Sequence, residues 1–168
     1  YYHSGQFNYG IITHEMGHNH GLHHASSYAC TASGVPVQVG GTCTVGEYGD
    51  PFDTMGGGLG KHFNAFDKGR TTSLLSWLTP SNELTVTSSG AYTIYPLEQS
   101  LPGVQVLRIP RAARSIAYPV EYLYVDFRES FGLDNFLSTD PVVNGVSIRL
   151  GPDYGTAQRT YLLDSVPG

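Results

Sequence analysis

Residues 14–24 of the chain read His14-Glu15-Met-Gly-His18-Asn-His-Gly-Leu-His-His24. In a helix, residues four apart lie on the same face, so His14 and His18 can bind one metal ion from the same side. Glu15 is one residue away from that face and can hold a water beside the ion without being a ligand. Two imidazoles with an adjacent carboxylate indicate a hydrolytic zinc site.

Gly21 predicts how a third ligand reaches the ion. Glycine readily adopts the left-handed conformation that ends a helix, so the chain can turn back there and bring His24 to the metal. Three protein ligands leave one position open for water, which is typical of a catalytic zinc site. His23 is the rival third ligand, but it lies one residue short of the pattern. We expect His20 and His23 to face solvent or to support the ligands.

The pattern H-E-x-x-H-x-x-G-x-x-H resembles that of the metzincin clan of zinc endopeptidases. The clan also has a downstream turn that contains a methionine, and the run Tyr48-Gly-Asp-Pro-Phe-Asp-Thr-Met-Gly56 is similar to it. Taken together, the two stretches are most similar to the gametolysin family, secreted metallopeptidases associated with breakdown of algal cell walls. The resemblance implies cleavage of extracellular protein or cell-wall glycoprotein.

The resemblance also implies a role for each site residue. Glu15 would be the general base, and Met55 would pack beneath the imidazoles without binding the metal. Zinc would be held by three histidines: His14, His18 and His24. Asp50 and Asp53, in the methionine turn, could orient that loop or hydrogen-bond a ligand histidine.

Metzincins resemble one another in placing a twisted sheet and a helix before the zinc helix. Only 13 residues precede His14, too few for that upper part of the domain. We therefore expect the chain to be a piece of a longer precursor. Residues 1–80 would form the lower part of a metzincin-like catalytic domain, and residues 81–168 a β-rich domain, so the predicted fold class is α+β.

Composition indicates a secreted, extracellular protein and argues against some partners. Charged residues make up only 14% of the chain, while glycine (21) and tyrosine (12) are abundant. The net charge of −5, without a basic cluster, makes nucleic acid a poor partner. No apolar run approaches the length of a membrane span.

The chain has two cysteines, Cys30 and Cys43. Two cysteines in a secreted-looking chain favour a disulfide. Zinc binding by this pair is less well supported, because the spacing is not C-x-x-C and the histidine motif accounts for the metal. A thiol that inhibits the enzyme from a propeptide is a further, weaker alternative.

Helical patterns occur at two places. The first runs from Tyr9 to Asn19 or His20 with Asn8 as its cap, and Ile11, Ile12 and Met16 would pack it onto the domain. The second runs from Asn64 to Trp77. Between them, residues 25–49 are polar and glycine-rich and predict a long loop.

After residue 80 the pattern becomes that of short strands separated by turns. Alternating apolar and polar residues predict an antiparallel sandwich or barrel. The predicted strands are 84–87, 91–95, 104–109, 121–127, 146–150 and 160–163. Loop aspartates Asp134, Asp140 and Asp153 could bind calcium, although they lack the dense spacing of a calcium loop.

Two other functions compete with the endopeptidase. The chain could be an inactive protease remnant whose β-rich half binds an extracellular partner, with tyrosines such as Tyr92 and Tyr122 stacking on sugars or peptides. An intact Glu15 argues against that decay. A zinc exopeptidase is the other alternative, and the three-histidine motif with its methionine turn disfavours it.

Overall fold

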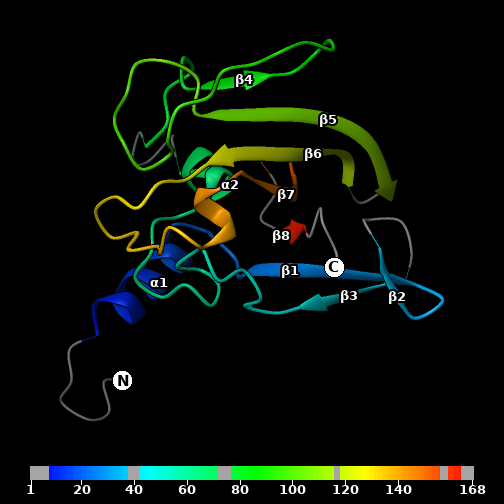
Figure 1. Ribbon diagram of the computed structural model, residues 1–168, viewed down its shortest axis with the longest axis horizontal. Helices are drawn as coiled ribbons and strands as arrows, with labels where there is room; N and C mark the ends of the chain where they lie inside the picture. The colour runs from blue at the N-terminus through cyan, green and yellow to red at the C-terminus, as the bar shows by residue number, and fades with distance from the viewer. Residues whose placement is uncertain (1–7, 38–41, 72–76, 116–117, 156–158, 164–168) are drawn as a thin grey trace.

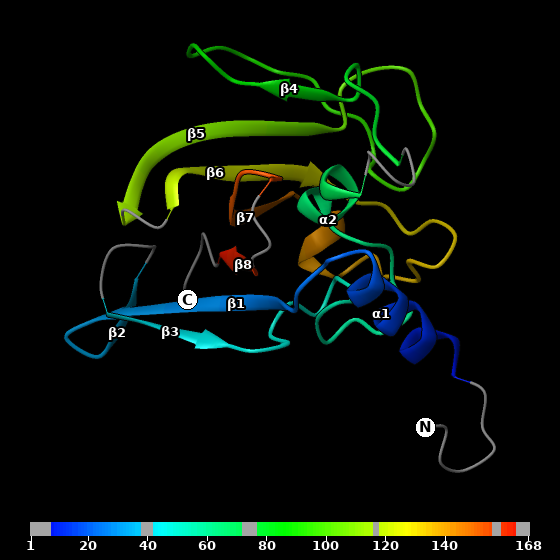
Figure 2. The same cartoon turned by 180° about the vertical axis from the view of Figure 1, so that it is seen from behind.

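The computed structural model describes residues 8–37, 42–71, 77–115, 118–155 and 159–163. One eight-stranded sheet dominates the molecule, and both helices lie toward the same end of it (Figures 1 and 2). The strand order is β2-β1-β8-β7-β6-β5-β4. β3 is not part of this order and pairs with β1. The elements are α1 (Tyr9–Asn19), β1 (Ala25–Ala32), β2 (Val35–Val37), β3 (Thr42–Gly46), α2 (Ala65–Arg70), β4 (Glu83–Thr85), β5 (Val106–Ser115), β6 (Tyr118–Phe127), the 3-10 helix η1 (Pro141–Val143), β7 (Val146–Pro152) and β8 (Thr160–Leu163).

The α+β class is confirmed, but the antiparallel sandwich is replaced by a single mixed sheet. Two pairs of strands are parallel, β1 with β8 and β4 with β5. In the first pair, Ala25 lies opposite Thr160, so strands from both sides of residue 80 belong to one sheet. Parallel pairing needs a long crossover between the strands, and such a connection leaves no local pattern in the sequence.

The predicted loop over residues 25–49 is wrong, because this segment contains β1, β2 and β3. Ser33 and Gly34 both have positive φ (51° and 78°), as a two-residue hairpin turn between β1 and β2 requires. Cys30 and Cys43 lie directly opposite each other on β1 and β3 and form a disulfide, which confirms the predicted pairing. β1 reads Ala-Ser-Ser-Tyr-Ala-Cys-Thr-Ala and β2 has only three residues, so neither carries the apolar alternation that predicts a strand.

Four of the predicted strands after residue 80 lie within or overlap β5 to β8 and a fifth overlaps β4, but residues 91–95 form no strand. The backbone N–H of Tyr95 donates to the Val104 carbonyl at 2.8 Å, without a ladder of further bonds. The alternation in residues 91–95 therefore marks an irregular segment beside the start of β5.

Helix α1 has the predicted bounds and cap. The Asn8 side chain accepts from the backbone N–H groups of Gly10 and Ile11, and the helix ends before Gly21, whose φ is 79°. The predicted packing face is wrong for Ile11 and Met16, which are 45% and 52% exposed, whereas Ile12 is half-buried. The helix instead buries Gly10, His14 and Gly17.

Close approach of the methionine turn explains that face. A Cβ on Gly17 would lie 2.4 Å from the Met55 sulfur, and one on Gly10 would lie 3.0 Å from the Gly60 nitrogen. Larger side chains at these positions would push α1 away from the turn. The helix therefore docks by backbone proximity and by one buried histidine.

Helix α2 begins where predicted, with the Asn64 side chain accepting from the Asp67 N–H at 3.0 Å. It ends at Arg70, and residues 72–76 of the predicted helix lie outside the described residues. Phe66 is fully buried and packs edge-on against Tyr124 of β6. Together with Ala65, Leu78, Leu97 and Val106, these two residues form the main apolar core, which joins α2 to the sheet.

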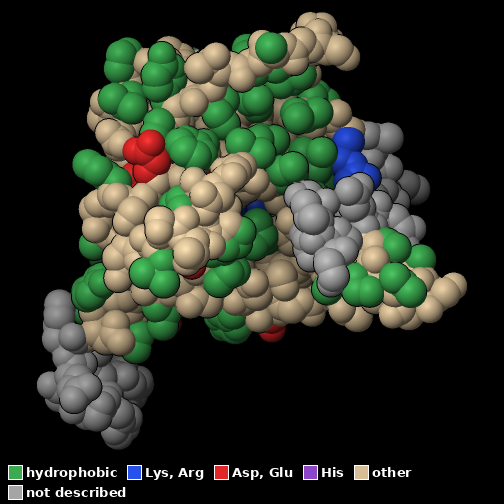
Figure 3. Space-filling view, in the orientation of Figure 1, with side chains coloured by type: hydrophobic (Ala, Val, Ile, Leu, Met, Phe, Trp, Pro, Cys, Tyr) green, Lys and Arg blue, Asp and Glu red, His purple; other side chains and the backbone are tan. Residues whose placement is uncertain are grey.

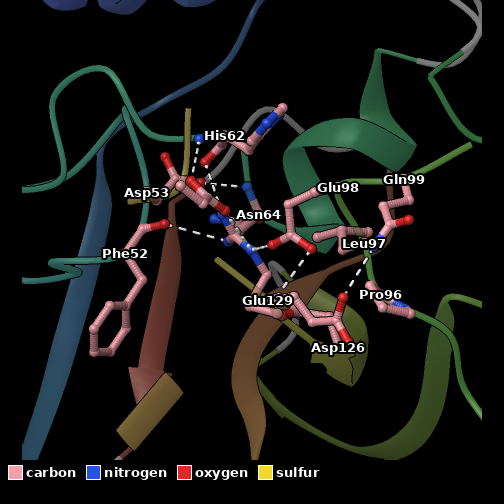
Figure 4. A network of polar contacts seen from close by, with 12 residues as sticks. Phe52, Asp53, His62, Asn64, Pro96, Leu97, Glu98, Gln99, Asp126 and Glu129 are labelled. Carbon is pink, nitrogen blue, oxygen red and sulfur yellow. Dashed lines mark hydrogen bonds and ion pairs between the residues drawn. The ribbon is translucent and has the colours of Figure 1, made fainter. Parts of the chain in front are cut away.

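Buried ion pairs form a second kind of core. Arg128, just after β6, is fully buried between Glu98 and Asp134 and also donates to the carbonyls of Phe52 (3.2 Å) and His62 (3.4 Å). Figure 4 shows Phe52, His62 and Glu98 approaching this network from separate segments. On the face shown in Figure 3, few charged groups appear. Much of the chain's limited charge lies inside the protein, because Asp50, Asp126, Arg128 and Arg149 are all fully buried.

Within the described residues, no helix is both long enough and apolar enough to cross a lipid bilayer.

Removing the disulfide should destabilise the fold without abolishing it. The bridge joins residues 13 apart, and closing a loop of that size stabilises by about 3 kcal/mol, mainly by restricting the unfolded chain. A Cys30→Ala/Cys43→Ala double variant should therefore lose about 2–3 kcal/mol of unfolding free energy in urea titrations. A loss below ~0.5 kcal/mol would mean that the paired strands need no cross-link.

Stability should fall as the pH rises, because of a buried acid on α2. Desolvation and then the neighbouring Asp53 raise the pKa of Asp67 well above its ordinary value, and burial raises that of Asp53 to about 7. A proton held more tightly in the folded state favours folding at low pH, and this contribution is lost as the pH rises through the folded-state pKa.

The matching test is Asp67→Asn, which cannot ionise. Its unfolding free energy relative to the wild type should rise by about 1 kcal/mol or more between roughly pH 5 and pH 8. Urea unfolding with a chelator present would measure this while keeping metal binding out of the comparison. A difference that is the same at both pH values would contradict the role given to Asp67.

Candidate metal centre

Three histidines from α1 and the segment after it meet at one point. His14 and His18 lie one turn apart on α1, and their ring centroids are 4.8 Å apart. The ring of His24 lies 5.5 Å from that of His14 and 5.0 Å from that of His18. One nitrogen from each ring lies within 4.8 Å of the other two, and in the described residues this is the one group of three or more potential ligands. The structure thus brings together the three predicted ligands.

Reversal of the chain at Gly21 carries His24 to the cluster. The positive φ of Gly21 allows the Leu22 N–H to bond back to the Gly17 carbonyl at 3.0 Å. Arg70 of α2 donates to the Gly21 carbonyl at 2.9 Å and fixes the turn to the second helix. The path between the second and third ligands is therefore held by backbone and side-chain bonds.

Each of the three rings is oriented by a bond at Nδ1. In His14 this atom lies 2.8 Å from the Thr54 carbonyl, and in His18 it lies 2.9 Å from the Leu22 carbonyl. In His24 it lies 2.8 Å from a carboxylate oxygen of Glu47. Because these oxygens accept, Nδ1 donates the hydrogen in each ring, and in a neutral ring Nε2 then has the lone pair that a metal needs.

Three neutral imidazoles fit zinc, and they also suit other first-row ions that favour nitrogen ligands. Partners at Nδ1 are the support that metal-binding histidines normally have. The donor set thus indicates a metal site, while the identity of the ion needs a measurement.

The methionine turn lies directly behind the histidines. Met55 is fully buried. Its side chain lies against Gly17 of α1 and belongs to the same apolar cluster as Phe63. The carboxylate of Asp53 accepts from the backbone N–H groups of Met55 and Asn64, which holds the turn closed. This rigid turn also presents the Thr54 carbonyl to His14.

Glu15 is exposed and shares a pocket with His14. The pocket has a volume of about 370 Å³ and is also lined by Ile11, Tyr48, Gly56, Gly57 and Leu59. Glu15 is absent from the group of potential ligands, so its carboxylate is placed beside the site and not within it. A group in this position is suited to act on a molecule bound in the pocket.

His20 and His23 lie outside the cluster. The His20 backbone caps α1, and the His23 side chain is exposed. Partial burial and the charge of Arg70 lower the pKa of His23. The structure therefore places His24 in the cluster and leaves the rival His23 outside it.

The sequence analysis missed two residues of the site, Glu47 and Tyr48. Glu47 receives the His24 hydrogen bond, which, with the nearby Arg159, lowers its pKa. The Tyr48 ring lies 3.9 Å from the His24 ring and 5.9 Å from the His14 ring, centroid to centroid. Tyr48 begins the methionine-turn run, but that run assigns it no contact with a histidine, and Glu47 lies outside both motifs.

Asp50 and Asp53 do not hydrogen-bond a ligand histidine. Asp50 pairs with Arg149 at 2.7 Å, and Asp53 closes the methionine turn. The three aspartates considered for calcium have separate partners: Asp134 with Arg128, Asp140 with the Leu137 N–H, and Asp153 with Arg108.

No family model matches this chain, and none of the curated proteins or solved structures compared with it is a match. Functional assignment therefore depends on the geometry of the site.

Separate substitutions of His23 and His24 would show which of them is the third metal ligand. His24→Ala should weaken zinc binding at least ~100-fold, because it removes one of three donors, whereas His23→Ala should change it less than ~3-fold. Competition with a chromophoric chelator measures both dissociation constants. The reverse order would make His23 the ligand.

Proposed function

We propose that this protein is a zinc-dependent endopeptidase of the gametolysin-like metzincin type. One observation carries the proposal: three histidines at the metzincin spacing converge, each with Nδ1 bonded to an oxygen, while Glu15 lies in the adjoining pocket. The sequence resemblance supplies the reaction class, and the geometry is compatible with it.

His14, His18 and His24 would hold the zinc through Nε2. When bound, zinc supplies a Lewis acid that activates water and polarises the scissile carbonyl. Because all three donors are neutral, they would leave most of the positive charge of the ion available for this purpose.

Glu15 would move the proton. Its carboxylate would accept a proton from the attacking water and then deliver it to the amine leaving group. This role needs a carboxylate that faces the pocket without being a ligand, which is where Glu15 lies.

The pocket provides a place for the substrate. Ile11 and Leu59 give it apolar walls, and Gly56 and Gly57 also line it. These features suit an extended peptide with an apolar side chain beside the scissile bond.

Extracellular action is part of the proposal. The Cys30–Cys43 disulfide would persist in an oxidising compartment, which is where secreted proteins fold and act. Together with the family resemblance, it supports an extracellular protein or cell-wall glycoprotein as substrate.

Glu15→Gln separates metal binding from catalysis. The variant should bind one zinc per chain with wild-type affinity and lose about 10²–10⁴-fold in the rate of casein cleavage, because the amide cannot accept the proton. Metal analysis and a casein assay measure the two properties. His20→Ala, outside the cluster, serves as the control and should keep both.

Several results would overturn the proposal. Undiminished cleavage by Glu15→Gln would exclude Glu15 as the base. Stoichiometric zinc with no cleavage of casein by the wild type would favour a non-catalytic metal site. Release of single residues from the chain ends of a peptide, with internal bonds intact, would indicate an exopeptidase.

A further inference from the structure

A single β-turn brings two side chains to the third histidine. The Gly49 N–H donates to the Gly46 carbonyl at 3.0 Å, so residues 46–49 form a turn with Glu47 and Tyr48 at its centre. The turn lies directly on β1, because a Cβ on Gly46 or Gly49 would meet the Ser27 hydroxyl at 2.7 or 2.2 Å. Glycine at both ends thus lets the turn sit close to the strand that follows His24.

Glu47 gives His24 a partner that the other two ligands lack. His14 and His18 donate to neutral backbone carbonyls, whereas His24 donates to a carboxylate. The same oxygen of Glu47 also pairs with Arg159 at 2.7 Å, just before β8. A carboxylate at Nδ1 fixes the tautomer and raises the basicity of the imidazole, and such partners commonly change metal affinity by 10–100-fold.

Tyr48 adopts a backbone conformation that is unfavourable for its residue type. Its φ is 59°, in the left-handed region, where glycine or asparagine is the usual residue. The side chain is 45% exposed, so core burial does not account for a tyrosine here. Its ring instead stacks over His24 and His14. Strain at a residue that contacts a site points to a role in that site.

We propose that the Gly46–Gly49 turn sets the metal affinity of the site, with Glu47 as a positioning residue for His24 and Tyr48 as a wall that holds the His24 and His14 rings in place. This inference rests on the proposed metal site and deepens it, because the third ligand follows the helix and needs an external support. His14 receives its support from the Thr54 carbonyl of the methionine turn, and His18 receives its support from the Leu22 carbonyl just after the helix.

Variants at Glu47 test the carboxylate. Glu47→Ala should raise the zinc dissociation constant about 10–100-fold, and Glu47→Gln, which keeps an acceptor without the charge, should fall between it and the wild type. Asp153→Ala is the matched control, since it removes an exposed carboxylate that pairs with an arginine and not with a histidine. It should leave the dissociation constant unchanged.

The Glu47 variants can also be compared in the metal-free protein. Long-range proton–nitrogen NMR spectra of the metal-free protein should show His24 with its hydrogen on Nδ1 in the wild type and a mixture of tautomers in Glu47→Ala. The His24→Ala variant assigns the signal. A His24 tautomer that does not respond to Glu47→Ala would overturn the positioning role whatever the catalytic result.

Variants at Tyr48 test whether its ring holds the His24 and His14 rings in place. Tyr48→Phe keeps the ring and should bind zinc like the wild type. Tyr48→Gly removes the ring and relieves the left-handed strain, so it should bind zinc several-fold more weakly while its metal-free Tm is no lower than that of the wild type. Zinc affinity equal to the wild type in Tyr48→Gly would overturn the role of the ring.

These outcomes separate the inference from the proposed function. If the wild type binds zinc and cleaves casein but Glu47→Ala and Tyr48→Gly bind zinc equally well, the turn has no such role and the peptidase assignment stands. If the variants lose zinc affinity while the wild type cleaves nothing, the turn keeps its role at a non-catalytic metal site. A wild type that binds no zinc overturns both.

Discussion

The fold and the candidate site are joined by the buried guanidinium of Arg149. It extends from β7 and bonds Asp126 of β6 at 2.8 Å and Asp50, at the start of the methionine turn, at 2.7 Å. All three side chains are fully buried. Loss of one member of such a group would leave an uncompensated buried charge, at a cost of about 3–5 kcal/mol. The turn is therefore fixed to the middle of the sheet by an interaction that tolerates little displacement.

The positions of the ligands follow from this attachment. The methionine turn places the Thr54 carbonyl against His14 and the Met55 side chain against Gly17 of α1. The turn that holds Glu47 follows β3 and lies against β1, the strand that follows His24. The rings are thus oriented by contacts 40 and 23 residues away in the chain, in addition to the spacing within the helix. Such preorganisation is what a catalytic metal site requires.

Local signals explain which features the sequence could predict. The helix spacing of His14 and His18, the cap at Asn8 and the stop at Gly21 depend on neighbouring residues, and the helix has the predicted bounds. Among the strands at 25–46, β1 pairs with β8, where Thr160 lies opposite Ala25 and 135 residues further along the chain, and such distant pairing leaves no local signal. Glu47 was not predicted as a partner of His24, because the turn that positions it lies 23 residues further along the chain.

The unequal partners of the three histidines are compatible with the proposed hydrolytic role. Structural zinc sites usually take a fourth protein ligand, often a thiolate, and both cysteines here are used in the disulfide. Two ligands with neutral partners preserve the charge of an ion, while one with a carboxylate partner strengthens its hold. The carboxylate that supports His24 belongs to Glu47, and Glu15 lines the pocket beside His14. Under the proposed function, the division of two acidic roles between Glu15 and Glu47 would allow tight binding of the metal and proton transfer in the same small site.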